Sequence, residues 1–184
     1  MLLTVEEWET ICEWQWRTTA SLTWREFCWK NLVRFFITPL QKRHQVQGSR
    51  CWRMCGGENV NHFHIFWDCP SLTQYWQEIH EAMELVFGMP IPFRCEVMYL
   101  GHETLVMSST DASLFRILMA ACKKTFTKKW LRPQIPTLND WVDIVHEIFI
   151  MERLTYSLRL KKDKFEKIWA KWIVYITPIR QDFV

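Results

Sequence analysis

Apolar residues recur at intervals of three and four along most of this chain, which is the period of an amphipathic α-helix. The pattern starts after Thr4, which together with Glu7 has the signature of an N-terminal capping box. Stripes of the same period follow in residues 24–36, 72–86, 114–130 and 141–154. The alternation of polar and apolar positions therefore predicts a mainly α-helical protein, built as a helical bundle.

Helix-capping residues predict several helix boundaries. Thr23–Glu26 and Thr137–Asp140 repeat the capping-box signature, so we expect a helix to begin at each. Gly88 follows a helical stripe and is expected to end it, because glycine readily adopts the left-handed conformation of a C-cap. Two segments allow alternatives: residues 95–100 fit a short strand or an extended link, and residues 137–174 fit one long helix or two.

The composition limits the class of protein. The chain has 184 residues, of which 49% are hydrophobic and only 5 are glycine, and this excludes collagen-like and disordered chains. Charges interrupt every apolar run before the roughly 18 residues of a membrane span, so we expect no membrane contact. We divide the chain into N-terminal helices at 1–40, a basic connector with a small irregular insert at 41–70, and a helical part at 71–184 that packs with the first.

Tryptophan is unusually frequent. The 12 tryptophans exceed what the core of one such domain needs. Most lie on the predicted apolar helix faces or inside the cysteine-rich insert. Four do not, and we expect these at an exposed docking or nucleic-acid-binding surface: Trp14, Trp16, Trp29 and Trp172.

Charged residues fall in blocks, although the formal net charge is only +3. Residues 41–57 carry four basic and no acidic side chains, and residues 112–136 carry six basic and no acidic ones. Basic blocks attract phosphate backbones, but they also occur as solvated helix faces. Trp52 either stacks on unpaired bases or packs over the neighbouring loop. The candidate contacts for RNA or single-stranded DNA are Lys42, Arg43, Arg50, Trp52, Arg53, Lys123, Lys124, Lys128, Lys129 and Arg132.

Three of the seven cysteines cluster with two histidines in a short segment. Cys51, Cys55, His64 and Cys69 have the spacing C-x3-C-x8-H-x4-C. Zn²⁺ takes four nitrogen or sulfur ligands in a tetrahedron, and short ligand pairs separated by a loop can provide them. His62 points to the same side as His64 if the segment is extended, so it remains an alternative ligand.

The predicted zinc site is structural. Four protein ligands would close the coordination shell, whereas a catalytic zinc keeps one position open for water. Gly56 and Gly57 suit a tight turn that brings backbone amides to the Cys55 sulfur. The sequence has no H-x-E or H-E-x-x-H arrangement beside the cluster and no recognisable nucleophile elsewhere. We therefore expect that the protein is not an enzyme and has no small-molecule substrate.

The insert and its flanks carry a more specific pattern. Cys51-Trp52-Arg53-x-Cys55-Gly56 is followed by His64-x-x-Trp67-Asp68-Cys69-Pro70 and by a helix that contains Trp76. These motifs resemble the zinc-binding region at the C-terminal end of the reverse transcriptase polyproteins of non-LTR (long interspersed element) retrotransposons. Trp24–Phe27, Phe35–Pro39 and Met151–Thr155 resemble the same region, so the similarity covers nearly the whole chain, from about Thr4 to Val184.

The resemblance implies a non-catalytic module that binds element RNA or target DNA during target-primed reverse transcription, beside the reverse transcriptase core. This chain departs from the family because it has no endonuclease section and no Asp-Asp dipeptide of a polymerase motif. The alternatives are a protein-interaction domain that docks on the polymerase, or a non-functional remnant of a truncated element. The first residues do not resemble a signal peptide, which predicts an intracellular protein of the cytoplasm or nucleus.

Overall fold

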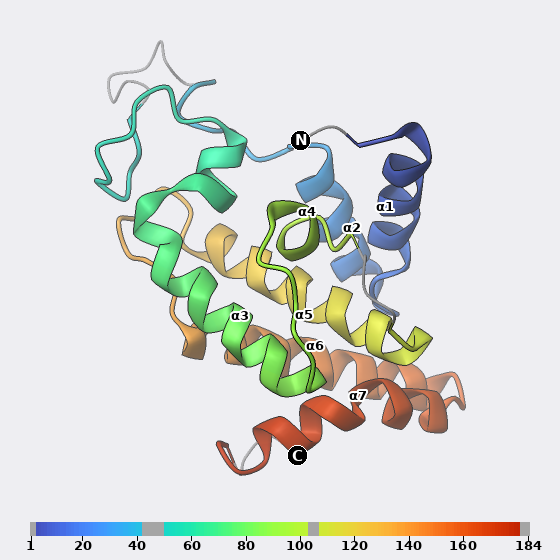
Figure 1. The fold of residues 1–184 in the computed structure, drawn as a ribbon. Helices are drawn as coiled ribbons and strands as arrows, with labels where there is room; N and C mark the ends of the chain where they lie inside the picture. Colours follow the sequence, from blue (N-terminus) through green and yellow to red (C-terminus); the bar gives the residue numbers. More distant parts are fainter. Residues whose placement is uncertain (1–2, 42–49, 103–106, 181–184) are drawn as a thin grey trace.

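The computed structural model describes residues 3–41, 50–102 and 107–180, which are mainly helical and contain no β-strand. This confirms the predicted fold class, a helical bundle with a small irregular insert. The helices are α1 (Val5–Arg17), α2 (Leu22–Leu32), α3 (Thr73–Phe87), α4 (Cys95–Met98), α5 (Ser109–Lys128), α6 (Leu138–Leu158) and α7 (Lys162–Ile176) (Figure 1). The insert contains one π-helical turn, η1 (His64–Asp68), and one 3₁₀ turn, η2 (Pro70–Leu72).

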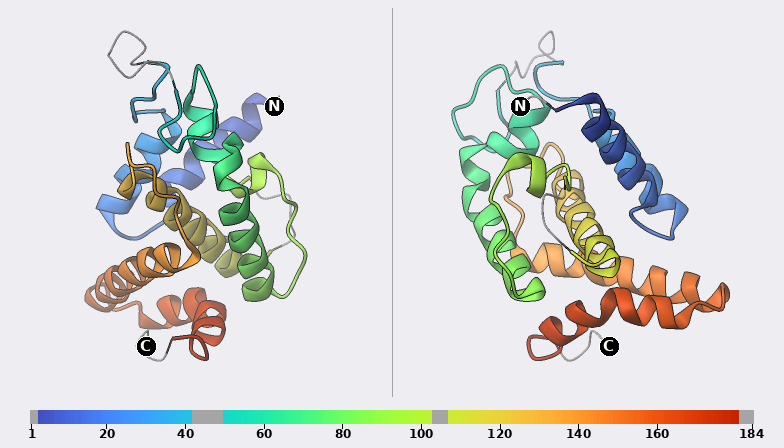
Figure 2. Two further views of the ribbon diagram at one scale, coloured as in Figure 1. Left: turned by 90° about the vertical axis from the view of Figure 1, so that its left-hand side faces the viewer. Right: turned by 45° about the vertical axis from the view of Figure 1, so that its right-hand side comes forward.

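Helix α5 runs through the middle of the molecule. It packs against α3, α6 and α7, while α1 and α2 pack against each other. Figures 1 and 2 show α6 and α7 side by side at the base, α3 on one side and the α1–α2 pair on the other. The irregular insert lies at the opposite end from α6 and α7 (Figure 2).

Large aromatic side chains fill the core between these helices. Trp141, Trp169 and Trp172 are fully buried, and the Trp141 indole N–H donates a hydrogen bond of 3.0 Å to the carbonyl of Leu118. The expectation that Trp172 lies on the surface is therefore wrong. Its ring meets that of Trp141 edge to face, with 5.2 Å between the ring centroids, because α7 turns this side chain towards α6.

The other three tryptophans without a predicted core position lie near or at the surface. Trp16 is 50% exposed and Trp29 is 43% exposed, as expected. Trp14 is half-buried, and the guanidinium of Arg116 lies 5.4 Å from its ring centroid. Exposed tryptophan is thus concentrated on α1 and α2.

The helix boundaries follow the capping signals in most cases. Both hydrogen bonds of the capping box are present at Thr4 and at Thr137, and Gly88 ends α3 with a φ of 64°. The predicted start at Thr23 is wrong, because α2 already begins at Leu22 after an N-cap at Ser21.

The two segments for which the sequence allowed alternatives, residues 95–100 and 137–174, both contain helices. Residues 95–100 contain α4 rather than a strand, since the amides of Met98 and Tyr99 donate to carbonyls four residues earlier, each at 2.8 Å. The C-terminal stretch forms two helices, α6 and α7, which are separated at Leu160 with a φ of 55°. Among the residues that the structure describes, no helix is long and apolar enough to cross a membrane.

Candidate metal centre and surrounding surface

The irregular insert between α2 and α3 brings together four of the predicted ligands. Cys51 and Cys55 flank a tight turn, closed by a 3.1 Å hydrogen bond from the Met54 amide to the Cys51 carbonyl. His64 begins η1, and Cys69 lies between η1 and η2. The sequence therefore supplies one ligand pair from a turn and the other from the two ends of a single helical turn.

The ligand atoms of this group converge. The sulfurs of Cys51 and Cys69 are 3.9 Å apart, and the Cys55 sulfur lies 3.3 Å from Nε2 of His64. All four ligand atoms lie within 4.8 Å of one another. Cys51 and Cys69 are buried, whereas Cys55 and His64 are partly accessible. One metal ion could therefore contact all four side chains.

His62, the alternative ligand, lies outside this group. Its Nδ1 is 3.4 Å from the hydroxyl of Tyr99, and its ring centroid is 4.5 Å from that of Phe66. The two histidines diverge because residues 62–68 are helical and not extended, and positions two apart on a helix differ by about 200°. Burial, together with the nearby charges of Arg34 and Lys123, lowers the pKa of His62 to about 4.

Backbone amides support each of the three sulfurs. The Gly57 amide lies 3.4 Å from the Cys55 sulfur, and the amides of Arg53 and Ser71 face the sulfurs of Cys51 and Cys69. Each amide belongs to the residue two positions after its cysteine. Such hydrogen bonds favour the negatively charged thiolate, which is the form that binds metal.

The two buried cysteines also interact directly. A hydrogen bond from Cys51 lowers the pKa of the Cys69 thiol, in opposition to burial, and the same contact raises the pKa of Cys51. The contact therefore favours the thiolate form at Cys69, which is the form that binds metal.

Two further residues shape the site from outside the ligand set. The Asn61 side chain accepts a 2.9 Å hydrogen bond from the His64 amide, as an N-cap does in the first turn of a helix. Gly57 lies so close that a Cβ at this position would be 2.8 Å from Cε1 of His64. Asn three residues before the histidine was a capping signal that our sequence interpretation missed.

Aromatic contacts anchor the insert to the end of α5. Trp52 and Trp130 meet at 4.8 Å between ring centroids. The Arg53 guanidinium lies between the rings of Trp52 and Phe126, at 5.6 and 5.7 Å, and donates a 2.9 Å hydrogen bond to the Ile65 carbonyl. Of the two alternatives for Trp52, the structure places its ring in packing contact over this part of the insert.

Two of the predicted nucleic-acid contacts are buried, so we remove them from the candidate surface. Arg53 is 6% exposed because it holds the insert together, and Lys123 is 3% exposed because α5 is covered on every side at this point. Neither side chain can reach a phosphate backbone in this arrangement.

The remaining candidates lie nearer the surface, but several are already paired. Arg50 is 3.7 Å from Glu58, Lys128 is 2.5 Å from Glu147, and Lys124 lies 4.8 Å from the ring centroid of Phe27. Arg132 is exposed. Lys42 and Arg43 lie outside the described residues.

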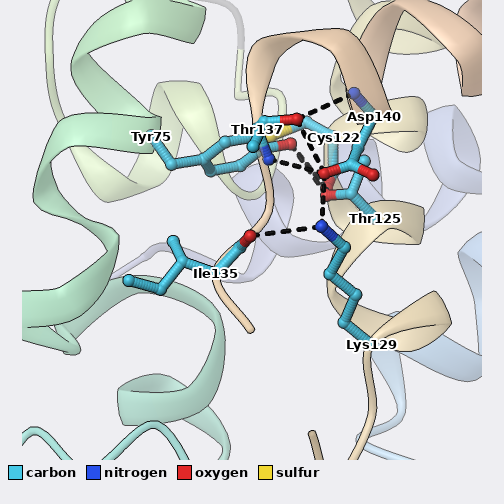
Figure 3. A network of polar contacts seen from close by, with 7 residues as sticks. All are labelled: Tyr75, Cys122, Thr125, Lys129, Ile135, Thr137 and Asp140. Atoms are coloured by element: carbon cyan, nitrogen blue, oxygen red, sulfur yellow. Dashed lines mark hydrogen bonds and ion pairs between the residues drawn. The ribbon is translucent and has the colours of Figure 1, made fainter. Parts of the chain in front are cut away.

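Lys129 is part of a polar network at the junction of α5 and α6 (Figure 3). Its ammonium binds the carboxylate of Asp140 and donates a 3.2 Å hydrogen bond to the Ile135 carbonyl. Asp140 also closes the capping box of Thr137, with 2.7 Å to the Thr137 amide. In the same view, the Tyr75 hydroxyl lies 2.8 Å from that of Thr125. Lys129 therefore has a structural partner in addition to any phosphate it contacts.

The fold and the site together define a helical protein with a candidate Cys₃His metal centre in an irregular insert. A comparison with models of known protein families found no family that matches this chain.

Proposed function

We propose that Cys51, Cys55, His64 and Cys69 bind one structural Zn²⁺. A tetrahedral zinc with Zn–S of about 2.3 Å and Zn–N of about 2.0 Å separates two sulfurs by about 3.8 Å, and sulfur from nitrogen by about 3.5 Å. The corresponding distances in the insert are 3.9 Å and 3.3 Å. Three sulfurs and one imidazole are also the donor types that zinc prefers in structural sites. The bound ion would cross-link the insert without leaving a position for a reactive water.

Metal analysis of the purified protein tests this assignment. We expect about one zinc per chain, lost on Cys51→Ser and on His64→Ala, because a ligand set of three binds a structural zinc poorly. His62→Ala is the matched control, since His62 is a neighbouring histidine outside the group, and it should keep its zinc. Retention in His64→Ala with loss in His62→Ala would overturn the ligand assignment.

We further propose that the zinc-stabilised insert and the end of α5 form one surface that binds single-stranded nucleic acid. The observation that carries this proposal is the contact between Trp52 and Trp130, which joins the two basic blocks of the sequence. Arg50 and Arg132, one from each block, are both exposed. Basic side chains beside aromatic rings are the usual composition of surfaces for unpaired RNA or DNA.

In this function the protein holds nucleic acid and performs no chemistry. Arg50 and Arg132 would bind phosphates, and the neighbouring Trp52 and Trp130 would offer an aromatic surface to an unstacked base. The resemblance to the tails of retrotransposon reverse transcriptases supports the same interpretation, with element RNA or target DNA as the ligand during target-primed reverse transcription.

Binding to unpaired RNA across a salt series tests the nucleic-acid proposal. We expect log affinity to fall linearly with log salt, and Arg50→Gln and Arg132→Gln each to weaken binding and flatten the slope by about 0.7. Lys162→Gln is the matched control, because Lys162 is an exposed cation on α7 at the base of the molecule. Absence of binding, or affinity that does not depend on salt, would contradict the proposal.

Docking on a protein partner is a second candidate function, favoured by one observation. Trp16, Trp29 and Leu22 present large apolar side chains to solvent on α1 and α2, and Leu22 is 70% exposed. Such side chains are enriched at protein interfaces, and the resemblance points to the reverse transcriptase core as the partner. Trp16→Gln and Trp29→Gln should then weaken association with that core but leave RNA affinity unchanged.

A further inference from the structure

A second candidate site lies apart from the four metal ligands. A cavity of about 90 Å³ opens between α1, the end of α2, the insert, α4 and α5. None of the Cys₃His ligands lines it, and its described lining includes no aspartate or glutamate. The residues that give the cavity its chemistry are Gln15, Asn31, Arg34, His62, Tyr99 and Lys123.

The floor of the cavity holds a buried lysine, Lys123. The Lys123 ammonium donates hydrogen bonds to the Tyr99 carbonyl at 3.0 Å and to Oε1 of Gln15 at 3.4 Å. It also lies 5.4 Å from the Tyr99 ring centroid. In the described part of the chain, no carboxylate pairs with Lys123, and its neighbours Cys28, Cys95 and Cys122 are thiols. Burial lowers the pKa of Lys123, because an ammonium without a counter-ion is unfavourable there, so an anion that binds from outside would stabilise the charged form.

Two buried polar atoms beside Lys123 have no hydrogen-bond partner among the described residues. Asn31 is 2% exposed, and its Oδ1 accepts a 2.7 Å hydrogen bond from the Tyr99 hydroxyl, which fixes the amide group. Its Nδ2 is left as a buried donor without an acceptor in this part of the chain, and Nε2 of His62 is likewise unpartnered. Unpaired buried polar groups are rare in folded proteins, and they indicate that water or a ligand completes the site.

The mouth of the cavity is positively charged as well. Arg34 lies two residues after the last residue of α2, has a φ of 55°, and is an exposed residue of the cavity lining. Its charge acts on both Tyr99 and His62. Trp8 and Phe63, which are half exposed, complete the rim. The cavity therefore has a buried lysine at its floor, an arginine at its entrance and an amide donor in its wall.

We propose that this cavity binds one small oxyanion, such as a short-chain carboxylate, carbonate or phosphate. Lys123 would pair with the anion, Nδ2 of Asn31 would donate a hydrogen bond to it, and Arg34 would cover it at the mouth. A cavity of about 90 Å³ is larger than one water needs and smaller than the roughly 150 Å³ of a cavity that holds benzene, so it suits an anion of this size. A nucleotide or a nucleic-acid backbone does not fit, so this site is independent of the proposed nucleic-acid surface.

Calorimetric titration of the metal-loaded protein tests the proposal, with acetate, bicarbonate and phosphate at ionic strength matched by sodium chloride. We expect saturable binding of at least one of these anions with one site per chain. Arg34→Gln, an exposed position, should raise the Kd about ten- to hundredfold, the usual effect of losing a charge-assisted hydrogen bond. Lys123→Met keeps the length of the side chain and should abolish binding. Lys128→Gln, on the same helix but outside the cavity, is the matched control.

Two results would overturn the proposal. One is no saturable binding of any of the three anions by the wild-type protein. The other is binding that Arg34→Gln leaves unchanged, which would place the anion elsewhere. If Lys123→Met does not fold, a crystal grown with the anion that binds in the titration decides the question: density for that anion between Lys123 and Asn31 supports the site, and water alone there rejects it.

Discussion

Gly57 occupies a crowded position in the candidate metal centre. A Cβ at this residue would lie 2.8 Å from Cε1 of His64 and 3.3 Å from the sulfur of Cys55. Gly57→Ala must therefore displace two ligands, and we expect it to weaken metal affinity about tenfold or more, as changes in the shell around metal ligands commonly do. Competition with a chromophoric chelator measures this affinity.

The control for this prediction is a glycine with the opposite properties. Gly88 has a φ of 64°, and a Cβ added there would meet no described atom within 4 Å, so Gly88→Ala strains the backbone without crowding its surroundings. It should lower the free energy of unfolding by about 1 kcal/mol and leave metal affinity unchanged. Equal metal affinity in the two variants would show that crowding at Gly57 is unimportant.

Some individual residues could be placed correctly from the sequence, and others could not. The ligands of the candidate centre could be predicted because Cys51, Cys55 and Cys69 are close in the chain, so their spacing alone constrains the site. The burial of Lys123 could not be predicted. A lysine in a basic run is usually solvated, and only the packing of distant segments buries this one. Trp172 was misplaced for the same reason, since the helix that covers it, α6, begins more than 30 residues earlier.

At the scale of elements, Glu152 connects α6 to the start of α2. This residue is 1% exposed, and its carboxylate accepts a hydrogen bond from the Ala20 amide, just before the N-cap Ser21. Burial raises the pKa of Glu152, although the amides of Ala20 and Ser21 and the charges of Arg25 and Arg159 oppose the shift. The charge of Glu152 therefore costs stability in the folded state, while its oxygen atoms satisfy buried donors.

Two substitutions separate these effects. Glu152→Ala should lower the free energy of unfolding by about 1–3 kcal/mol at pH 7, because buried amides lose their acceptor. Glu152→Gln keeps an acceptor and should cost less, or even stabilise. Urea unfolding at several pH values measures both.

The pH dependence has a defined sign. Because the folded-state pKa of Glu152 lies above its ordinary value, the wild type loses stability as pH rises from about 4.5 through the folded pKa. Glu152→Gln removes this loss, so its stability relative to the wild type should increase over that range. The pH dependence of the metal centre is common to both proteins and cancels in the difference. If the free energies of unfolding of the two proteins differed by the same amount at every pH in this range, the raised pKa of Glu152 would be contradicted.

The junction of α5 and α6 offers a second prediction at this scale. Burial opposes ionisation of Asp140, but the ammonium of Lys129 and the donors of Thr137 hold its pKa below the ordinary value. A double-mutant cycle with Lys129→Met and Asp140→Asn should give a coupling energy of about 0.5–1 kcal/mol. The more exposed pair Lys128 and Glu147 is the control, and its coupling should be smaller, at most about 0.3 kcal/mol. Equal coupling in both cycles would contradict the role of partial burial.

Helix boundaries show what local sequence can and cannot determine. Thr4 and Thr137 begin helices as predicted, because a capping box is satisfied within four residues. The predicted helix start at Thr23 was wrong. Glu152, more than 120 residues away, binds the backbone ahead of α2, and the helix starts earlier. The prediction of a strand or an extended link at residues 95–100 was wrong because a short apolar run has no clear period. Only its packing against the core selects the helix α4.

At the scale of the whole molecule, one turn of the insert separates the two candidate sites. His64 points to the other metal ligands, whereas His62 points to Tyr99 and the anion cavity. The divergence follows from the helical geometry of residues 62–68, whereas His62 was an alternative ligand only if the segment were extended. The core is continuous through this region, since Ile65 and Phe66 pack in the same hydrophobic cluster as the helices.

The continuity of the core raises the question of how far the effect of metal removal spreads. If the proposed Zn²⁺ cross-links the Cys and His side chains, its removal should open residues 50–69. The aromatic core of Trp141, Trp169 and Trp172 lies between α6 and α7, at the other end of the molecule, and does not need the metal. Hydrogen exchange with and without a chelator should therefore show faster exchange in 50–69 and at the end of α5, with α6 and α7 unchanged. Loss of protection throughout α6 and α7 would instead make the metal a condition for the whole fold.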